Sequence, residues 1–141
     1  MPPVPDYHRV GIIGIDGFSL MSMASTIEPL RVANEIAGTT LYELIFLSSS
    51  ASGRASAGLA IPGAVPLRGA GALDFVFTIA GGDPFAVKDR QFFEWLREQD
   101  DEGAYIGGIS GGPVLLARAG LMEGYRMTLN WSHRERLLEM N

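Results

Sequence analysis

Residues 108–112, which read Gly-Ile-Ser-Gly-Gly, are the part of the sequence that most resembles a catalytic motif. They match G-x-S-x-G and lie between a predicted strand and a predicted helix, the setting in which a serine becomes an exposed nucleophile. Such a serine needs a histidine base that is oriented by a carboxylate. After Ser110 the chain offers only His133, with Glu123 as the one acidic residue between them. A serine-dependent hydrolase or amidase using Ser110 is therefore an alternative function and not the preferred one.

The same glycine-rich turn has a second, non-catalytic use. Consecutive backbone N–H groups at the start of a helix bind anions and carboxylates without any reaction. A second turn, Gly81-Gly82-Asp83, follows another predicted strand. We therefore expect the N–H groups near Gly82 and Gly111, together with the Ser110 hydroxyl, to hold a ligand carboxylate.

Cysteine and histidine usage excludes several other site types. The chain has no cysteine, so it has no disulfide framework, no thiolate zinc site and no cysteine nucleophile. Its two histidines, His8 and His133, lie near opposite ends of the sequence without ligand-type spacing. We expect neither a metal nor a cofactor.

The elements that would position these turns alternate along the chain. Apolar runs of strand length predict strands buried on both faces at 9–15, 41–47, 74–80 and 105–109. Helical spacing predicts helices from Ser19 to Gly38, around 92–96 and from 114 to 120. Strands that alternate with helices favour a mostly parallel sheet covered on both faces, with ligands bound outside the carboxyl ends of the strands.

Three segments carry more particular expectations. Pro29 lies inside the first helical pattern and predicts a kink or a break there. A stretch with weak alternation around residues 59–65 is interpreted as a small excursion with a hairpin. Residues 137 and 138, both leucine, begin an amphipathic stretch that needs a packing partner.

Composition and charge limit the class of protein. A chain of 141 residues, 47% hydrophobic and 19% charged, is predicted to fold as one globular domain over 1–141. The net charge of −5 provides no basic surface for nucleic acid. The first residues lack the basic and apolar regions of a signal peptide, and no apolar run approaches the roughly 20 residues of a membrane span. We interpret the protein as cytoplasmic, with no membrane partner.

Two blocks of sequence resemble a known superfamily. Residues 109–131, ISGGPVLLARAGLMEGYRMTLNW, are similar to the elbow segment of the ThiJ/PfpI superfamily, which has the class I glutamine-amidotransferase-like fold. Residues 17–22, GFSLMS, and 28–34, EPLRVAN, resemble the branch found as the N-terminal domain of AraC-family transcription regulators. This resemblance covers nearly the whole chain. It implies a sensor of metabolites such as arginine, glycine betaine or carnitine.

Three departures from the superfamily pattern decide between sensing and catalysis. Ser110 stands where the enzymes carry cysteine, Ser22 aligns with a supporting glutamate, and Asn130 replaces a histidine before Trp131. Groups that transfer protons or attack are thus replaced by groups that only form hydrogen bonds. The resemblance therefore implies a polar pocket without catalytic activity.

These observations predict a flavodoxin-like three-layer α/β sandwich, apparently truncated at its C-terminus, where a regulator would continue into a helix-turn-helix DNA-binding domain. The predicted function is a non-catalytic ligand-sensing and dimerisation domain that responds to an amino-acid-like or betaine-like effector. The expected partners are this effector, a second copy of the chain, and DNA through the missing domain. The predicted ligand-binding residues are Ser110, Gly111, Gly82, Asp83, Glu28, Asn130 and Trp131.

Overall fold

The computed structural model describes residues 6–140 as a parallel sheet with helices on both faces. The proline-rich start of the chain, residues 1–5, and residue 141 lie outside the described residues. Five strands occur in the order β3-β2-β1-β4-β5, and every pair is parallel. They are β1 (His8–Gly14), β2 (Tyr42–Ser48), β3 (Val65–Pro66), β4 (Phe75–Ala80) and β5 (Tyr105–Ser110). The two-residue β3 is a short edge strand, and without it the order β2-β1-β4-β5 is the 2-1-3-4 order of the flavodoxin-like fold, which confirms the predicted fold class.

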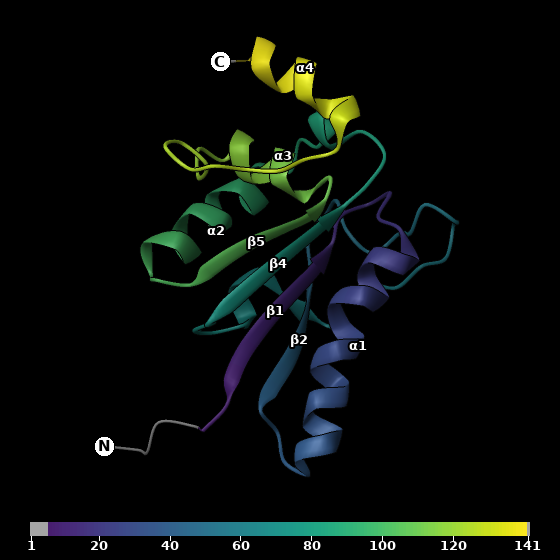
Figure 1. Ribbon diagram of the computed structural model, residues 1–141, viewed down its shortest axis with the longest axis vertical. Coiled ribbons are helices and arrows are strands. Elements are labelled where there is room, and N and C mark those ends of the chain that lie inside the picture. The colour runs from purple at the N-terminus through teal and green to yellow at the C-terminus, as the bar shows by residue number, and fades with distance from the viewer. Residues whose placement is uncertain (1–5, 141) are drawn as a thin grey trace.

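The helices form the two outer layers of the sandwich. Helix α1 (Leu20–Ala37) covers one face, whereas α2 (Arg90–Asp101) and α3 (Gly112–Arg118) cover the other (Figure 1). Helix α4 (Trp131–Glu139) lies beyond α3, at the end of the molecule toward which the strands run. Short 3-10 turns occupy η1 (Leu67–Gly69) and η2 (Pro84–Ala86). Among residues 6–140, no helix combines the length and apolar character that crossing a bilayer requires.

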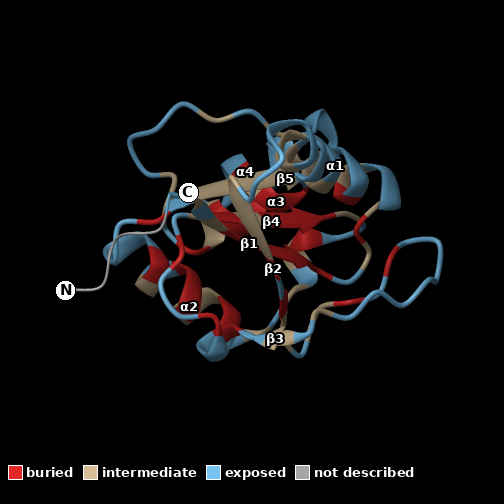
Figure 2. Ribbon diagram, turned by 90° about the horizontal axis from the view of Figure 1, so that it is seen from below, coloured by how far each residue is buried: buried red, intermediate tan, exposed pale blue. Residues whose placement is uncertain are grey.

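Side chains of the central strands alternate between two apolar clusters. Ile13 and Val76 belong to the cluster beneath α2 and α3, which also holds the fully buried Trp95. Val10 and Ile12 belong to the cluster beneath α1. Burial on both faces explains why these strands read as continuous apolar runs. Figure 2 shows the buried residues concentrated along the strands, with exposed loops around them.

Helix α1 begins and ends where its sequence predicts. The Ser19 side chain accepts a hydrogen bond from the Ser22 N–H at 3.0 Å, and Gly38 ends the helix in the left-handed conformation, with φ 67°. Of the predicted kink or break at Pro29, the break does not occur, because the helix runs on through this residue. Pro29 is exposed, and so is Ser25, whose carbonyl loses its helical partner and can bond to water instead.

The excursion after β2 is only in part the predicted hairpin. An antiparallel bridge joins Arg54 to Ala60, and Ala51 accepts the N–H of Asp16 at 2.8 Å. Asp16 also accepts the Arg54 N–H through its carboxylate at 2.9 Å. Val65 leaves this excursion and forms a parallel edge strand beside β2. The excursion is therefore fastened to the loop after β1, at the carboxyl end of the sheet.

Candidate functional site

The loops after β1, β4 and β5 meet at the carboxyl end of the sheet. Gly111 donates its N–H to the Ala80 carbonyl at 2.8 Å, which joins the turn after β5 to the end of β4. A Cβ built on Gly81 would lie 2.4 Å from the Gly17 carbonyl oxygen, so the turn after β4 lies directly against the loop after β1. The turns that carry Gly81 and Ser110 therefore lie together, beside the loop that leads from β1 into α1.

Ser110 has a strained backbone at this meeting point. Its φ is 58°, and it is the only non-glycine residue among 6–140 with a positive φ. The left-handed conformation costs an L-residue about 1–2 kcal/mol. Ser110 is exposed, so its hydroxyl faces solvent at the carboxyl end of the sheet.

The glycines of the G-x-S-x-G motif are required by packing alone. A Cβ on Gly108 would lie 2.5 Å from the Pro113 nitrogen, and one on Gly112 would lie 2.2 Å from the Thr78 carbonyl oxygen. Real Cβ atoms do not approach so closely, hence both positions must be glycine for α3 to turn back onto the sheet. The motif is thus explained by the geometry of the turn, whether or not Ser110 reacts.

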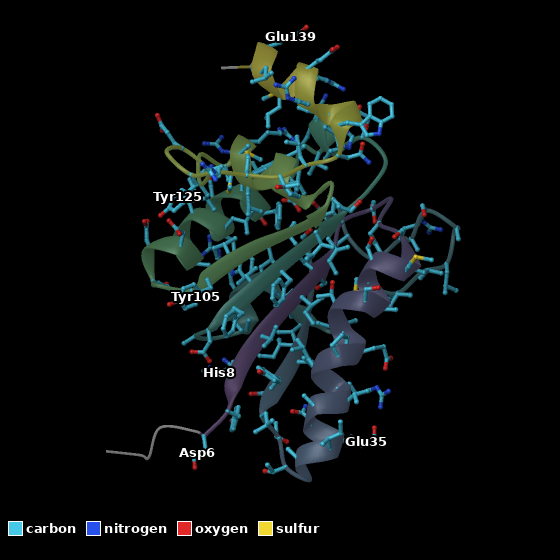
Figure 3. All side chains as sticks on the ribbon, in the orientation of Figure 1. Asp6, His8, Glu35, Tyr105, Tyr125 and Glu139 are labelled. Carbon is cyan, nitrogen blue, oxygen red and sulfur yellow. The ribbon has the colours of Figure 1, made fainter. Side chains whose placement is uncertain are left out.

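Catalytic partners for Ser110 are absent from the hydrogen bonds formed within residues 6–140. The His133 ring packs edge-on against Phe85, with 5.8 Å between ring centroids. His8 stands at the start of β1, opposite to the end where Ser110 lies (Figure 3). In this same range, no three His, Asp or Glu side chains gather closely enough to hold a metal ion.

Replacing Ser110 by glycine tests the strain directly. We expect Ser110→Gly to stabilise the protein by about 1 kcal/mol in urea unfolding, because glycine adopts a positive φ without steric conflict. Ser50→Gly is the matched control, since Ser50 is an exposed loop serine whose φ is not positive. It should be neutral or slightly destabilising. Equal effects of the two substitutions would contradict the strained geometry at Ser110.

Asp83 and the turn after it hold the C-terminal helix. The Asp83 carboxylate accepts the Phe85 N–H at 3.1 Å and pairs with Arg136 of α4 at 3.2 Å. The Arg136 guanidinium also stacks over the Phe85 ring, at 4.4 Å from its centroid. Leu137 of α4 is buried, as its predicted need for packing requires, while Leu138 stays exposed. Asp83 therefore joins the turn after β4 to α4.

Arg118 fixes the same turn from the side of α3. Its guanidinium donates to the carbonyls of Pro84 and Val87, both at 2.7 Å, and lies 4.7 Å from the centroid of the Phe93 ring. Desolvation by burial is the main cause that lowers the pKa of Arg118 from its ordinary value. Arg118 is not among the predicted site residues, because no local sequence pattern marks an arginine that bonds to carbonyls distant in sequence.

Removing this arginine should loosen the turn. We expect Arg118→Ala to reduce the free energy of unfolding by about 1.5–3 kcal/mol, since two hydrogen bonds from a charged donor are lost and two carbonyls lose their partner. Arg118→Lys should not restore stability, because one ammonium lacks the planar fork that reaches both oxygens. Arg90→Ala removes an exposed arginine paired with Glu94 and should change stability by less than about 0.5 kcal/mol. A similar loss in both alanine variants would contradict this role.

The remaining predicted site residues are Asn130, Trp131 and Glu28, and Ser22 is the position that aligns with the superfamily's supporting glutamate. Asn130 caps α4 by accepting the Ser132 N–H at 3.0 Å. Trp131 is 85% exposed at the start of α4. Glu28 lies two turns along α1, pairs with Arg31 at 2.6 Å and lines a separate cavity. Ser22 is engaged with the Ser19 hydroxyl at 2.8 Å. The structure thus gathers Ser110, Gly111, Gly82 and Asp83 but not Glu28.

Comparisons with known proteins agree with this fold. The profile of the DJ-1/PfpI family matches residues 8–141. The chain is 38% identical over 133 residues to the HTH-type transcriptional regulator GlxA of Rhizobium meliloti, covering 93% of this chain and 41% of that protein. It is 38% identical over 118 residues to the HTH-type transcriptional regulator CdhR of Pseudomonas aeruginosa, covering 83% of this chain and 35% of that protein. The chain therefore spans about two fifths of the length of these regulators.

Solved structures show the same arrangement of strands and helices. An AraC family transcriptional regulator from Pseudomonas putida superposes with a TM-score of 0.80 at 23% identity, over 94% of this chain and 71% of that one. Oxidized Toxoplasma gondii DJ-1 superposes with a TM-score of 0.72 at 18% identity, over 92% of this chain and 70% of that one. At these identities the likeness concerns the fold.

Proposed function

This chain belongs to the DJ-1/PfpI family, and we propose that it is the non-catalytic ligand-sensing domain of an AraC-type transcription regulator. The observation that carries this proposal is the similarity to an HTH-type regulator over 93% of this chain. The matched part is only 41% of that regulator. DNA contact would come from a helix-turn-helix domain that follows the sensing domain, and the whole protein would act in the cytoplasm.

The geometry of the carboxyl end supports binding rather than reaction. Neither His8 nor His133 is hydrogen-bonded to Ser110 within the described residues, and the His133 ring packs against Phe85 instead. The proposed effector is a small amino-acid-like or betaine-like molecule whose carboxylate meets the Ser110 hydroxyl and the N–H groups near Gly111 and Gly82. Asp83 belongs to the same turn as Gly82. A shift of this turn on effector binding would therefore be passed to α4 through the ion pair between Asp83 and Arg136.

Regulation would follow from a shift between two arrangements of a homodimer. An effector that binds one arrangement more tightly favours it, and the spacing of the attached DNA-binding domains changes accordingly. The Asp83–Arg136 contact supports such a link, because it joins the proposed binding turn to α4.

A thermal-shift screen against amino acids, betaines and polyamines tests the sensing function. A ligand at a hundredfold excess over its dissociation constant stabilises the folded state by about 2.7 kcal/mol, which raises the midpoint of unfolding measurably. We expect a concentration-dependent rise with at least one carboxylate-bearing compound, and a weaker rise in Ser110→Ala. If the midpoint of unfolding of the folded protein did not rise with any compound of the panel, the proposal would be contradicted. That result would favour a dimerisation module with a vestigial pocket.

Labelling separates this function from the alternative of a serine hydrolase or amidase. A fluorophosphonate reacts covalently with an activated serine, so a hydrolase would be labelled at Ser110 and its Ser110→Ala variant would not. We expect no labelling of either protein. Labelling that disappears in Ser110→Ala would overturn the non-catalytic assignment.

A further inference from the structure

A cavity of about 510 Å³ opens between α1 and the segment that leads into β3. Its walls include Leu20, Met23 and Ile27 of α1, together with Phe46 of β2 and Ile61 of the excursion. The size lies in the range of about 300–1,000 Å³ that small-molecule sites occupy, and a mostly apolar lining is also typical of them. None of Ser110, Gly111, Gly82 and Asp83 lines this cavity, so it is separate from the proposed effector site.

The apolar side chains around the cavity are left open to solvent. Leu20, Phe46 and Ile61 are 36%, 40% and 42% exposed, although each is large and apolar. They come from three separate elements and converge on one hollow instead of being scattered. Covering them with a ligand would remove apolar surface from water, which is favourable in proportion to the area buried.

Tight backbone packing shapes the wall opposite to α1. A Cβ on Gly63 would lie 2.1 Å from the Leu47 carbonyl oxygen, hence the segment lies directly on the end of β2. The neighbouring Pro62 packs on Gly53, where a Cβ would lie 3.0 Å from the Pro62 Cα. The wall is therefore held by close backbone contacts, which favour a preformed cavity over a transient gap between loops.

Glu28 gives the cavity a negative charge. It is the one titratable residue among those that line the hollow, and its side chain is 53% exposed. Both contacts from Arg31 are made to the same carboxylate oxygen, Oε2, and Arg31 also pairs with Glu35 at 3.0 Å. The other oxygen, Oε1, has no hydrogen-bond partner among the described residues. A carboxylate in an apolar hollow attracts a cation, and the aromatic ring of Phe46 adds a favourable surface for one.

From these observations we propose that the cavity between α1 and residues 61–64 is a second binding site, which takes a small organic cation with an apolar body. The apolar walls hold the body of the ligand, and Glu28 with Phe46 selects its positive charge. This proposal goes beyond the sensing function at Ser110, because binding here needs none of the residues around that turn.

Three probes that share a benzyl body and differ in charge test the site. They are benzyltrimethylammonium, benzyl alcohol and phenylacetate, each titrated calorimetrically into the 141-residue chain. A probe of this size should bind with a dissociation constant on the order of a millimolar. We expect the cation to bind about five- to tenfold more tightly than the alcohol, and the anion to bind most weakly. Equal affinities for all three, or no binding of the cation, would overturn the proposal.

Variants then assign the binding to this cavity. Glu28→Gln should remove the preference for the cation and leave the affinity for benzyl alcohol unchanged. Ala24→Phe, at an exposed α1 position that lines the cavity, should fill it and weaken both probes about tenfold or more. Ile36→Ser is the matched control, because Ile36 is an 82% exposed residue of the same helix outside the cavity, and it should leave both affinities unchanged. Cation binding that survives Ala24→Phe would overturn the assignment.

Failure of this site is distinguishable from failure of the proposed sensing function. An effector from the thermal-shift screen that is sensitive to Ser110→Ala but not to Ala24→Phe would leave sensing intact while the three probes decide on the cavity. The cavity could instead be filled by a second copy of the chain, and sedimentation equilibrium tests this alternative by measuring the oligomeric state. A change of oligomeric state in Ala24→Phe, with no binding of the cation to the unsubstituted chain, would show an interface and overturn the proposal.

Discussion

Replacing Trp95 by alanine should reduce the free energy of unfolding by about 3–5 kcal/mol. Trp95 of α2 is 2% exposed and packs in the larger apolar cluster beneath α2 and α3. A loss of this size is a large part of the roughly 5–15 kcal/mol that stabilises a domain. Urea unfolding followed by circular dichroism measures it. Trp95→Phe, which keeps most of the apolar volume, should retain cooperative unfolding at reduced stability if the alanine variant does not fold.

The other tryptophan is the matched control. Trp131 is 85% exposed at the start of α4, so Trp131→Ala should change stability by less than about 0.5 kcal/mol. It also leaves Trp95 as the only indole, since the chain has two tryptophans. The emission of Trp131→Ala should therefore lie at short wavelength in the folded state and move to longer wavelength on unfolding. Equal destabilisation by the two alanine substitutions would contradict the burial described above.

Gly112→Ala should destabilise the protein by about 2–3 kcal/mol. The added Cβ would lie 2.2 Å from the Thr78 carbonyl oxygen in β4, so either α3 or the strand must move. The backbone of β4 cannot yield easily, because it is paired with β1 on one side and β5 on the other. The displacement would also disturb the neighbouring Ser110, so effector stabilisation in the thermal-shift screen should weaken.

Gly69→Ala controls for the chemical change from glycine to alanine. The nearest atom to a Cβ at Gly69 is 3.5 Å away, an ordinary contact, and its φ is not positive. We expect this variant to remain within about 0.5 kcal/mol of the unsubstituted protein. If Gly112→Ala were equally harmless, α3 would not abut β4 as closely as the structure has it.

The elements of the fold were predictable because their signals are local. Buried parallel strands read as apolar runs, and caps such as Ser19 and Gly38 mark helix ends through their own side chain or conformation. Whether a proline breaks a helix depends on where it faces, which the sequence around Pro29 does not show. An exposed proline leaves an exposed carbonyl that water can satisfy.

The candidate site was predictable only in part. The turns at Ser110 and Gly82 carry glycines at strand ends, and the carboxyl ends of parallel strands meet at one edge of a sheet. The prediction places Glu28 in the same pocket because it belongs to one of the two resembling sequence blocks. Such a block does not show in which direction a helical side chain points, and Glu28 lines the separate cavity beside α1. The contacts of Arg118 and the cavity beside α1 depend on residues far apart in sequence, so no local pattern indicates them.

Mass spectrometry of the protein and its ligand after prolonged incubation shows whether this domain binds an effector at the Ser110 turn without converting it. The compound that gives the largest thermal shift is incubated with stoichiometric protein, and both are then separated and weighed. We expect the ligand to be recovered chemically unchanged and the mass of the protein to be unaltered. A hydrolysed or otherwise converted ligand, or an added mass that maps to Ser110 and is lost in Ser110→Ala, would contradict it.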